Sequence, residues 1–486
     1  MKKNLFFVFA ILFFSLPIFS QNVEIIDFMR LNPYSKRNNP AYFIPYNGYV
    51  GIPVLSNFNF SLYNTGFHLN NLIVRDNNGT PLRFSSDKFV NSLAKNNWFN
   101  IGMNFELLGF GFRVNKYFFS FDYQLKMDGS FRYSKDLFGF LLHGNLAQNS
   151  NGDYLYTETS PAILSIEPNL NIYQEMSLGI QGQIRDNLYI GVCPKILFGL
   201  INFKTEQFNA KIYTNPDDYT IYGNYNVAMK MASVVPFYKI ENGTLKLSTE
   251  DFSDISNIAN RLFSTNLGFA IDLGAVYRVN QQIRVSASVT DLGFIRWKGT
   301  PLKMGIKTLD KEYLEFSGFN TDQIINFIHN GITINLDSIV NRNLILEETN
   351  PYSTMLTSKI MFDGYFDLTP SNRFIIQMKG YIIGKHILPQ FTVAYNGTFF
   401  NLIDIVISYS MLKKSFDNIG LGLGLRLGPI HLYAGTDNVL GALNILNAKK
   451  LNLTAGLLID FPITKKVKEK ELKSLFGNKK DKQENE

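Results

Sequence analysis

The sequence predicts an all-β protein, specifically a transmembrane antiparallel β-barrel of 14 or 16 strands. Apolar and polar residues alternate in runs of ten to fourteen from Leu267 to Phe461, with tight polar turns between the runs. An apparent export signal precedes them, and short and long connections alternate along the chain. A period of two is strand geometry, and tilted strands that cross a bilayer need about 9 to 11 residues with apolar side chains towards lipid.

The clearest run begins at Gly420 and ends at Pro429. Leucine occupies one face of this strand, whereas the other face carries Gly420, Gly422, Gly424 and Arg426. Small residues could relieve crowding where a barrel strand bends. Alternatively, the three glycines could leave space in the lumen for an inserted segment such as residues 32–45, because backbone approaches closely only where no side chain projects. Both explanations stay open at this point.

Other runs share this alternation. From Leu267 to Val279 the apolar residues would face lipid, and Asp272, Gly274 and Arg278 would face inward. Similar two-residue stripes occur at residues 119–127 and 403–411. The predicted lumen therefore carries charges of both signs, which is affordable only if they face water or one another.

The termini lie outside the barrel pattern. Residues 1–20 have two lysines, an apolar core and a small residue at Ser20, which predicts a cleaved signal peptide. Residues 21–46 contain Asn32-Pro33 and Asn39-Pro40, and proline disfavours an internal strand. We expect the barrel to occupy residues 47–461, and the Lys- and Glu-rich residues 462–486 to form a solvated periplasmic tail.

Every second connection is predicted to be a short periplasmic turn. These turns are placed at residues 115–116, 185–187, 215–218, 280–282, 369–371, 396–398 and 428–429. The intervening connections are long, at 64–98, 128–173, 233–265, 298–354 and 438–448, as in outer-membrane barrels. The count reaches 16 strands if residues 188–213 form two strands, and 14 if weaker candidates in the first half are loops.

Composition argues against several classes of protein. No linker divides the 486 residues, so one large unit is expected. Cys193 is the single cysteine, the five histidines are far apart in sequence, and no nucleophile or dinucleotide motif is present. We therefore expect no enzyme activity, no catalytic residues, no metal and no cofactor. The net charge of +7 is dispersed apart from the tail, which argues against a nucleic-acid partner.

Four strings together resemble a family of Bacteroidota outer-membrane barrels of unknown function. They are NNPAYFIP from Asn38, VGIPVLSN from Val50, SASVTDLGFIRW from Ser286 and GLGLRLGPIHLYAGTDN from Gly422. This family is distantly similar to FadL-type channels for hydrophobic substrates and to PorV- and PorP-type barrels linked to type IX secretion. The FadL likeness implies an N-terminal segment tucked into the lumen, which maps onto Asn39, Pro40 and Ala41. Phe461 resembles the terminal aromatic residue of a barrel-insertion signal, although 25 residues follow it.

Two functions follow as alternatives for a protein of the Gram-negative outer membrane. The first is a FadL-like, porin-like channel or transporter for a small or hydrophobic solute. The second is a structural or accessory barrel for protein secretion or surface anchoring, with a periplasmic or secretion-system partner. Under either alternative, the expected partners include outer-membrane lipid and, during biogenesis, the barrel-assembly machinery.

Overall fold

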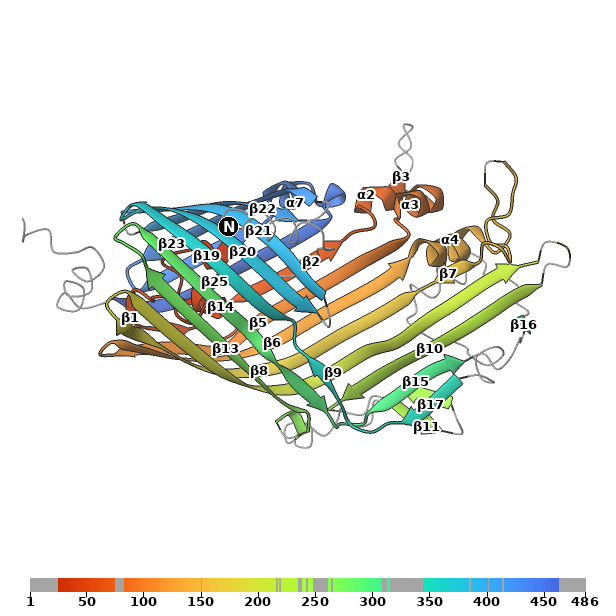
Figure 1. Ribbon diagram of the computed structural model, residues 1–486, viewed down its shortest axis with the longest axis horizontal. Coiled ribbons are helices and arrows are strands. Elements are labelled where there is room, and N and C mark those ends of the chain that lie inside the picture. The colour runs from red at the N-terminus through yellow and green to blue at the C-terminus, as the bar shows by residue number, and fades with distance from the viewer. Residues whose placement is uncertain are drawn as a thin grey trace, which may run out of the picture.

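In the computed structural model the chain forms a closed antiparallel β-barrel (Figure 1). The structure describes residues 25–74, 83–149, 151–215, 217, 220–234, 238–241, 244–247, 261–263, 265–307, 313–314, 344–383, 386–400, 402–412 and 415–462. The predicted signal peptide, most of the connection at 298–354 and the tail beyond Pro462 lie outside these ranges.

The ring closes through fourteen strand positions within the described residues, which confirms the 14-strand prediction. In ring order the first seven are β1 (Tyr46–Gly51) with β2 (Phe58–Asn64), β5 (Asn96–Val114), β6 (Tyr117–Ser134), β8 (Ile166–Arg185), β9 (Leu188–Thr214), β13 (Leu267–Arg278) and β14 (Ile283–Trp297). The other seven are β18 (Tyr352–Met355) with β19 (Ser358–Thr369), β20 (Asn372–Ile383), β21 (His386–Phe399), β22 (Ile403–Leu412), β23 (Ser415–Leu427), β24 (Ile430–Thr436) and β25 (Lys450–Pro462). Strand β25 pairs with β1 and β2 and closes the ring.

Strand β9 has 27 residues and is a single strand, so the division of residues 188–213 behind the 16-strand alternative is wrong. Its first half pairs with β13, and its second half pairs with β10 (Ile221–Ser233) outside the ring. Strand β10 in turn carries β15 (Leu302–Lys307) and β16 (Tyr313–Leu314), and β15 carries β17 (Leu344–Glu348). The prediction of a short periplasmic turn at 215–218 is therefore wrong, because β9 ends at Thr214 and β10 begins at Ile221 at the end of the long loops.

The sheet forks where β9 leaves the ring, and an apolar cluster packs this fork. Trp297 is fully buried there, and its indole Nε1 donates a hydrogen bond to the Thr354 hydroxyl at 2.8 Å. A Cβ at Gly199 would come within 2.6 Å of the Trp297 ring. Glycine at this position thus lets the indole lie against the strand backbone.

The short connections lie at one end of the barrel, on the left in Figure 1. Strand boundaries place turns at 115–116, 186–187, 279–282, 370–371 and 428–429, close to the predicted positions. The prediction at 396–398 is wrong by four residues, because β21 continues through Phe399 and β22 begins at Ile403. Phe400 has a positive φ of 53°, a conformation that favours glycine or asparagine, so the residue type at position 400 does not predict it.

Small elements cover the opposite end. They are α2 (Leu69–Leu72), β3 (Ile73–Val74), β4 (Arg83–Phe84), α3 (Ser86–Ser92), α4 (Lys135–His143), β7 (Ala162–Leu164), β11 (Tyr238–Glu241), β12 (Thr244–Leu247), α7 (Val439–Leu443) and η4 (Ile445–Asn447). Helices α3 and α4 begin after Ser85 and Ser134, whose hydroxyls accept hydrogen bonds from backbone N–H groups three residues on. A cluster around Phe89 and Tyr133 packs the two helices together.

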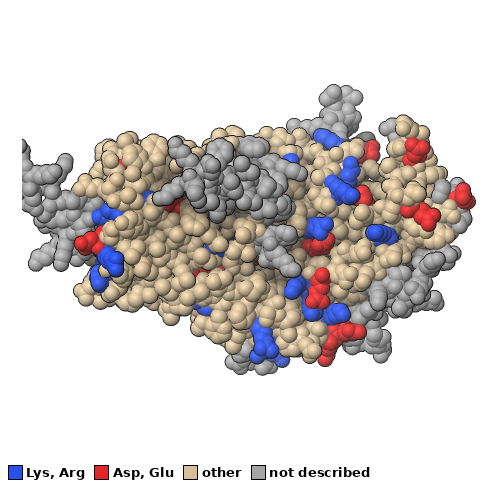
Figure 2. Space-filling model, viewed as in Figure 1, with Lys and Arg blue, Asp and Glu red and all other residues tan. Residues whose placement is uncertain are grey.

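The outer surface of the ring is apolar, and its side chains alternate as predicted. Leu267, Phe269, Leu273 and Tyr277 are exposed on the outside of β13, whereas Asp272 is buried on the inside. The leucines of β23 likewise point outward and its glycines inward. In Figure 2 visible charged side chains gather at the left end and across the right half of this face, and few lie between the left end and the centre. Among the described residues, none of the helices is long and apolar enough to span a membrane.

Candidate functional site: the N-terminal segment and two cavities

Residues 25–45 contact inward-facing side chains from strands all around the ring. They form η1 (Ile25–Phe28) and η2 (Pro33–Arg37), two short 3-10 helices that follow one another closely. Asn32 caps η2 by accepting a hydrogen bond from the backbone N–H of Tyr34, and Pro33 fixes the first helical position. The Asn-Pro pair that excluded a strand thus begins a tight helical turn.

The first contact region of the segment is apolar. Ile25 and Met29 pack against the glycine faces of β23 and β24. A Cβ at Gly422 would lie 2.6 Å from the Met29 methyl, and one at Gly435 would lie 2.5 Å from Ile25. Real Cβ atoms do not approach so closely, so a side chain at either position would force Met29 or Ile25 to shift.

The remaining two predicted glycines have different neighbours. A Cβ at Gly420 would meet the Ser408 hydroxyl first and Ile25 at 3.1 Å. At Gly424 it would meet Asp404 and His431 on the neighbouring strands, and no atom of the segment is among its nearest neighbours.

A polar contact adds to this apolar region. The backbone N–H of Ile25 donates to the Asp437 carboxylate at 2.9 Å.

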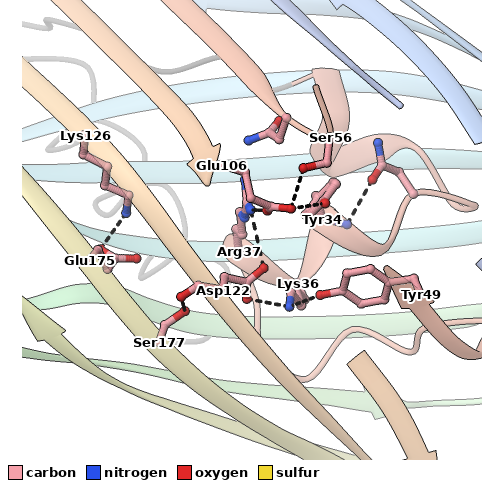
Figure 3. Close-up of polar contacts among 12 residues, drawn as sticks. Tyr34, Lys36, Arg37, Tyr49, Ser56, Glu106, Asp122, Lys126, Glu175 and Ser177 are labelled. Carbon is pink, nitrogen blue, oxygen red and sulfur yellow. Dashed lines mark hydrogen bonds and ion pairs between the residues drawn. The ribbon is translucent and has the colours of Figure 1, made fainter. Parts of the chain in front are cut away.

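The second contact region is ionic and is drawn in Figure 3. Lys36 Nζ lies 2.7 Å from an Asp122 carboxylate oxygen of β6, and Arg37 contacts both Asp122 and Glu106. Tyr34 and Ser56 donate their hydroxyl protons to the same Glu106 carboxylate. All of these groups are largely buried, so each charge is compensated within the network.

Two irregularities in the wall direct Glu106 inward. The first strand is interrupted between β1 and β2, where Val54 has a positive φ of 67° and donates its backbone N–H to the Glu106 carbonyl at 2.7 Å. In the pairing of β5 with β6 the register shifts between Glu106 and Leu108. A bulge of this kind changes the direction of one side chain. Here it turns the Glu106 carboxylate into the lumen, where it pairs with Arg37.

Burial and neighbouring charges shift the pKa values of the segment's own groups. Burial in the apolar surroundings, together with Glu106, raises the pKa of the Tyr34 hydroxyl well above its usual value. Burial disfavours the charged Arg37 guanidinium, but Glu106 and Asp122 outweigh it, so the Arg37 pKa is raised. The protonated forms of both groups are therefore favoured while the segment is docked.

The third contact region is the sequence Asn39-Pro40-Ala41. Asn39 is fully buried, and its side-chain amide donates long hydrogen bonds of 3.5 Å to the carbonyls of Ala275 and Ala287. Its Oδ1 accepts from the Ala41 backbone N–H at 2.9 Å. A Cβ at Gly191 would overlap the Pro40 carbonyl, and one at Gly274 would overlap the Asn39 amide oxygen.

Two cavities lie on either side of this segment. The loop-side cavity, of about 160 Å³, is lined by Tyr34, Lys36 and Arg37 of the segment together with polar residues of β6, β8 and β9. The turn-side cavity, of about 260 Å³, is lined by Phe28, Arg30 and Tyr42 together with residues near the short turns. Asp27 borders both cavities, so the segment is the partition between them.

The loop-side cavity also borders a charged cluster beyond the segment. Asp291 has a positive φ of 56° at a bulge in β14, and its carboxylate lies 2.6 Å from Lys195 and 3.0 Å from Lys359. Lys195 also pairs with Asp272 at 2.7 Å. This is a compensated ion network, and among the described residues no group of His, Cys, Asp and Glu side chains could hold a metal ion.

Sequence reasoning missed most of the residues that contact the segment. Gly191, Gly274 and Gly435 were not proposed as contacts, although each is a glycine in a strand at a position that faces the lumen. Glu106 and Asp122 were likewise missed, and inward-facing acids opposite a Lys-Arg pair would have been the signal. Phe461 lies half-exposed at the end of β25, paired with Gly48 of β1.

The chain belongs to the family described as "Family of unknown function (DUF5723)", which it matches over residues 40–437. No curated protein matches the chain. Among solved structures, it is similar to the Ralstonia pickettii toluene transporter TbuX, with 9% identity, a TM-score of 0.43 and coverage of 92% of this chain and 100% of that one. It is also similar to a Pseudomonas aeruginosa FadL homologue, with 9% identity, a TM-score of 0.42 and coverage of 92% of this chain and 100% of that one. A third similar structure is the TodX deltaS2S3 mutant monoaromatic hydrocarbon channel, with 10% identity, a TM-score of 0.42 and coverage of 88% of this chain and 95% of that one. At these identities and TM-scores, the solutes named for those proteins are not assigned to this chain.

Proposed function

We propose that this member of the DUF5723 family is an outer-membrane channel or transporter for a small or hydrophobic solute. In this proposal residues 21–46 are a plug in the lumen, and Asn39, Pro40 and Ala41 hold its centre. The observation that carries the proposal is the pair of cavities separated by the segment. A structural core has no need of cavities on both sides of a buried segment, whereas a gated path does.

The contacts that hold the segment suit a movable partition. They are hydrogen bonds, ion pairs and apolar contacts, each of which can be exchanged for water. Buried ion pairs contribute little net stability, because the cost of removing two charges from water offsets their attraction. A shift of the segment that hydrates Lys36 and Asp122 together therefore costs less than their short separation suggests.

The outer membrane of a Gram-negative bacterium is the proposed location. The support is the closed ring with its apolar outside, since a closed sheet pairs every backbone group that would otherwise face lipid. The predicted signal peptide is consistent with export. Fractionation of membranes and a mobility shift between boiled and unboiled samples test this location and fold.

The transport proposal is tested by locking the segment. Cys193 is the only cysteine, so Cys193→Ser gives a clean background for Asn39→Cys with Gly274→Cys, two positions that lie against each other. In proteoliposomes we expect solute release with the pair reduced and little release with it oxidised. Asn39→Cys alone is the matched control and should not respond to oxidant. Equal release in both redox states, or none in either, contradicts a gating plug.

The second candidate function, a structural or accessory barrel, is favoured by the sheet outside the ring. Strands β10, β15 and β17 extend from β9 beyond the barrel wall and present a surface that a pore does not require. Secretion or surface anchoring would use such a surface, as the PorV/PorP resemblance implies. Crosslinking from exposed positions on β10, followed by identification of captured proteins, distinguishes this function from transport.

A further inference from the structure

The turn-side cavity has an unusual excess of positive charge. Five arginines line it, against two carboxylates, Asp27 and Asp367, and one of the five, Arg426, is paired with Asp460 at 2.7 Å. Asp27 is already paired with Lys379 at 3.1 Å. Asp367 is shared, because Arg284 and Arg373 both donate to it, Arg373 at 2.6 Å.

Arg30 brings a further guanidinium to this pair from the N-terminal segment. It donates to the Pro370 carbonyl, in the short turn that joins the strands carrying Asp367 and Arg373. Burial and the nearby Arg373 lower the Arg30 pKa to about 10, and Asp367 only partly offsets them. Three guanidiniums therefore crowd around one carboxylate, which is the electrostatic environment of an anion site.

The same cavity has aromatic walls. Tyr42 and Tyr365 meet edge to face with ring centroids 6.0 Å apart, and Phe43 and Tyr189 do so at 6.2 Å. The Arg373 and Arg284 guanidiniums lie over the Tyr365 ring, at 5.5 and 5.9 Å from its centroid. The charged groups and the apolar wall thus adjoin at Tyr365 instead of lying at separate ends.

The size of the cavity limits what it can hold. An apolar cavity of about 150 Å³ is enough for benzene. At about 260 Å³, the turn-side cavity has room for one ring with a short side chain and an acid group. A bare inorganic anion would leave the aromatic walls unused, and a neutral ring would leave the arginines without an added partner.

We propose that the turn-side cavity binds a compact organic monoanion, a carboxylate on an aromatic or similarly compact apolar body. The carboxylate lies among Arg30, Arg284 and Arg373, and the apolar body lies against Tyr42, Phe43 and Tyr189. The inference rests on the proposed function in one respect only: such a site would select solutes on their way past the segment. Binding itself does not depend on transport.

The test measures binding to the detergent-solubilised full chain by calorimetry, with 4-phenylbutyrate as the probe. 4-Phenylbutanol is the neutral analogue and sulfate is the anion without an apolar body. We expect 4-phenylbutyrate to bind at least about tenfold more tightly than either, the ratio that one charge-assisted hydrogen bond can supply. Equal binding of the alcohol, equal binding of sulfate, or no binding of 4-phenylbutyrate overturns the proposal.

Variants place the binding in this cavity. Arg30→Gln removes one guanidinium. Its hydrogen bond goes to the Pro370 carbonyl, so the change does not break an ion pair at hydrogen-bond distance. The triple variant Arg284→Gln, Arg373→Gln, Asp367→Asn removes the other two arginines together with their carboxylate. Each should weaken 4-phenylbutyrate binding about tenfold. Arg185→Gln, an exposed arginine at the same end of the barrel, is the control and should bind as the wild type does.

If both cavity variants keep wild-type affinity, the site is elsewhere and the proposal is wrong. Binding that is normal in a chain with no redox-dependent release would contradict transport and leave the site intact. Release that responds to the Asn39–Gly274 lock in a chain that binds no 4-phenylbutyrate would contradict the site and leave transport intact.

Discussion

The N-terminal segment is attached to the barrel in two contrasting ways. At Ile25 and Met29 the contact is apolar, and these side chains fit because Gly422 and Gly435 of the barrel have no side chain. At Lys36 and Arg37 the barrel contributes carboxylates, and the contact is ionic. Apolar contact depends on shape and is insensitive to pH, whereas the ionic contact fails if either side loses its charge alone. One end therefore positions the segment, and the other provides a means of release.

The contrast predicts that unpairing the ionic attachment has the largest effect. Glu106→Gln with Asp122→Asn leaves Lys36 and Arg37 without carboxylate partners, which costs about 3–5 kcal/mol for a broken buried pair. A buried reporter, Ala41→Cys in the Cys193→Ser background, should then react with a water-soluble maleimide on the order of 100-fold faster.

The matched control for this prediction removes both sides of the attachment. Adding Lys36→Gln and Arg37→Gln to the two carboxylate changes leaves no unpaired charge, so the labelling rate should return most of the way to the wild-type value. A rate that rises equally in both variants would mean that the ionic attachment matters only through packing.

Gly191 tests the contact at Pro40, and the next largest effect is expected there. In Gly191→Leu the new side chain overlaps the Pro40 backbone, which costs about 1–3 kcal/mol and should speed Ala41→Cys labelling about tenfold or more. Gly364→Leu is the control, because a Cβ at Gly364 has open space within 4 Å. Unchanged labelling in Gly191→Leu, with the barrel still folded on unboiled gels, would contradict the observed position of Pro40.

A smaller difference should separate two glycines of one strand. Gly422→Ala presses on the flexible end of Met29 at 2.6 Å, whereas Gly424→Ala meets Asp404 at 3.2 Å and leaves the segment alone. We expect Gly422→Ala to raise the labelling rate a few-fold, about 1 kcal/mol or less, because the Met29 methyl can move. The same rate in both variants would favour strand bending over segment docking as the reason for this glycine face.

The smallest effect should be a loosening of the segment above about pH 10. Docking raises the pKa of the Tyr34 and Tyr42 hydroxyls. As the pH rises, the two hydroxyls therefore lose their protons more readily in the released segment than in the docked one, which favours release. Arg30 acts in the opposite sense, because its lowered pKa makes docking easier once it is deprotonated. Arg37 keeps its proton between pH 9 and 11, so the two tyrosines are opposed only by Arg30 in this range. Conductance across a planar bilayer should therefore rise between pH 9 and 11, and less so in Tyr34→Phe. A fall in conductance would contradict this balance.

Sequence reasoning predicted the ring well and the lumen poorly, and the reason is physical. Each strand records its lipid face in its own alternation, so Leu267 and Phe269 predict their own positions. Contacts inside the lumen join residues far apart in sequence, such as Asn39 with Ala275 and Ala287, and a local pattern does not contain them. The glycines of β23 were an exception, because three of them, Gly420, Gly422 and Gly424, occupy successive positions on one strand face.

The most direct test of the central claim is whether Asn39 lies against Gly274 in the native membrane. In the Cys193→Ser background, Asn39→Cys with Gly274→Cys should form a disulfide in isolated outer membranes under mild oxidation. Asn39→Cys with Gly364→Cys should not, since Gly364 has open space around it. Rapid crosslinking of the first pair alone is the predicted result, and failure of that pair to crosslink, or equal crosslinking of both pairs, would contradict the account.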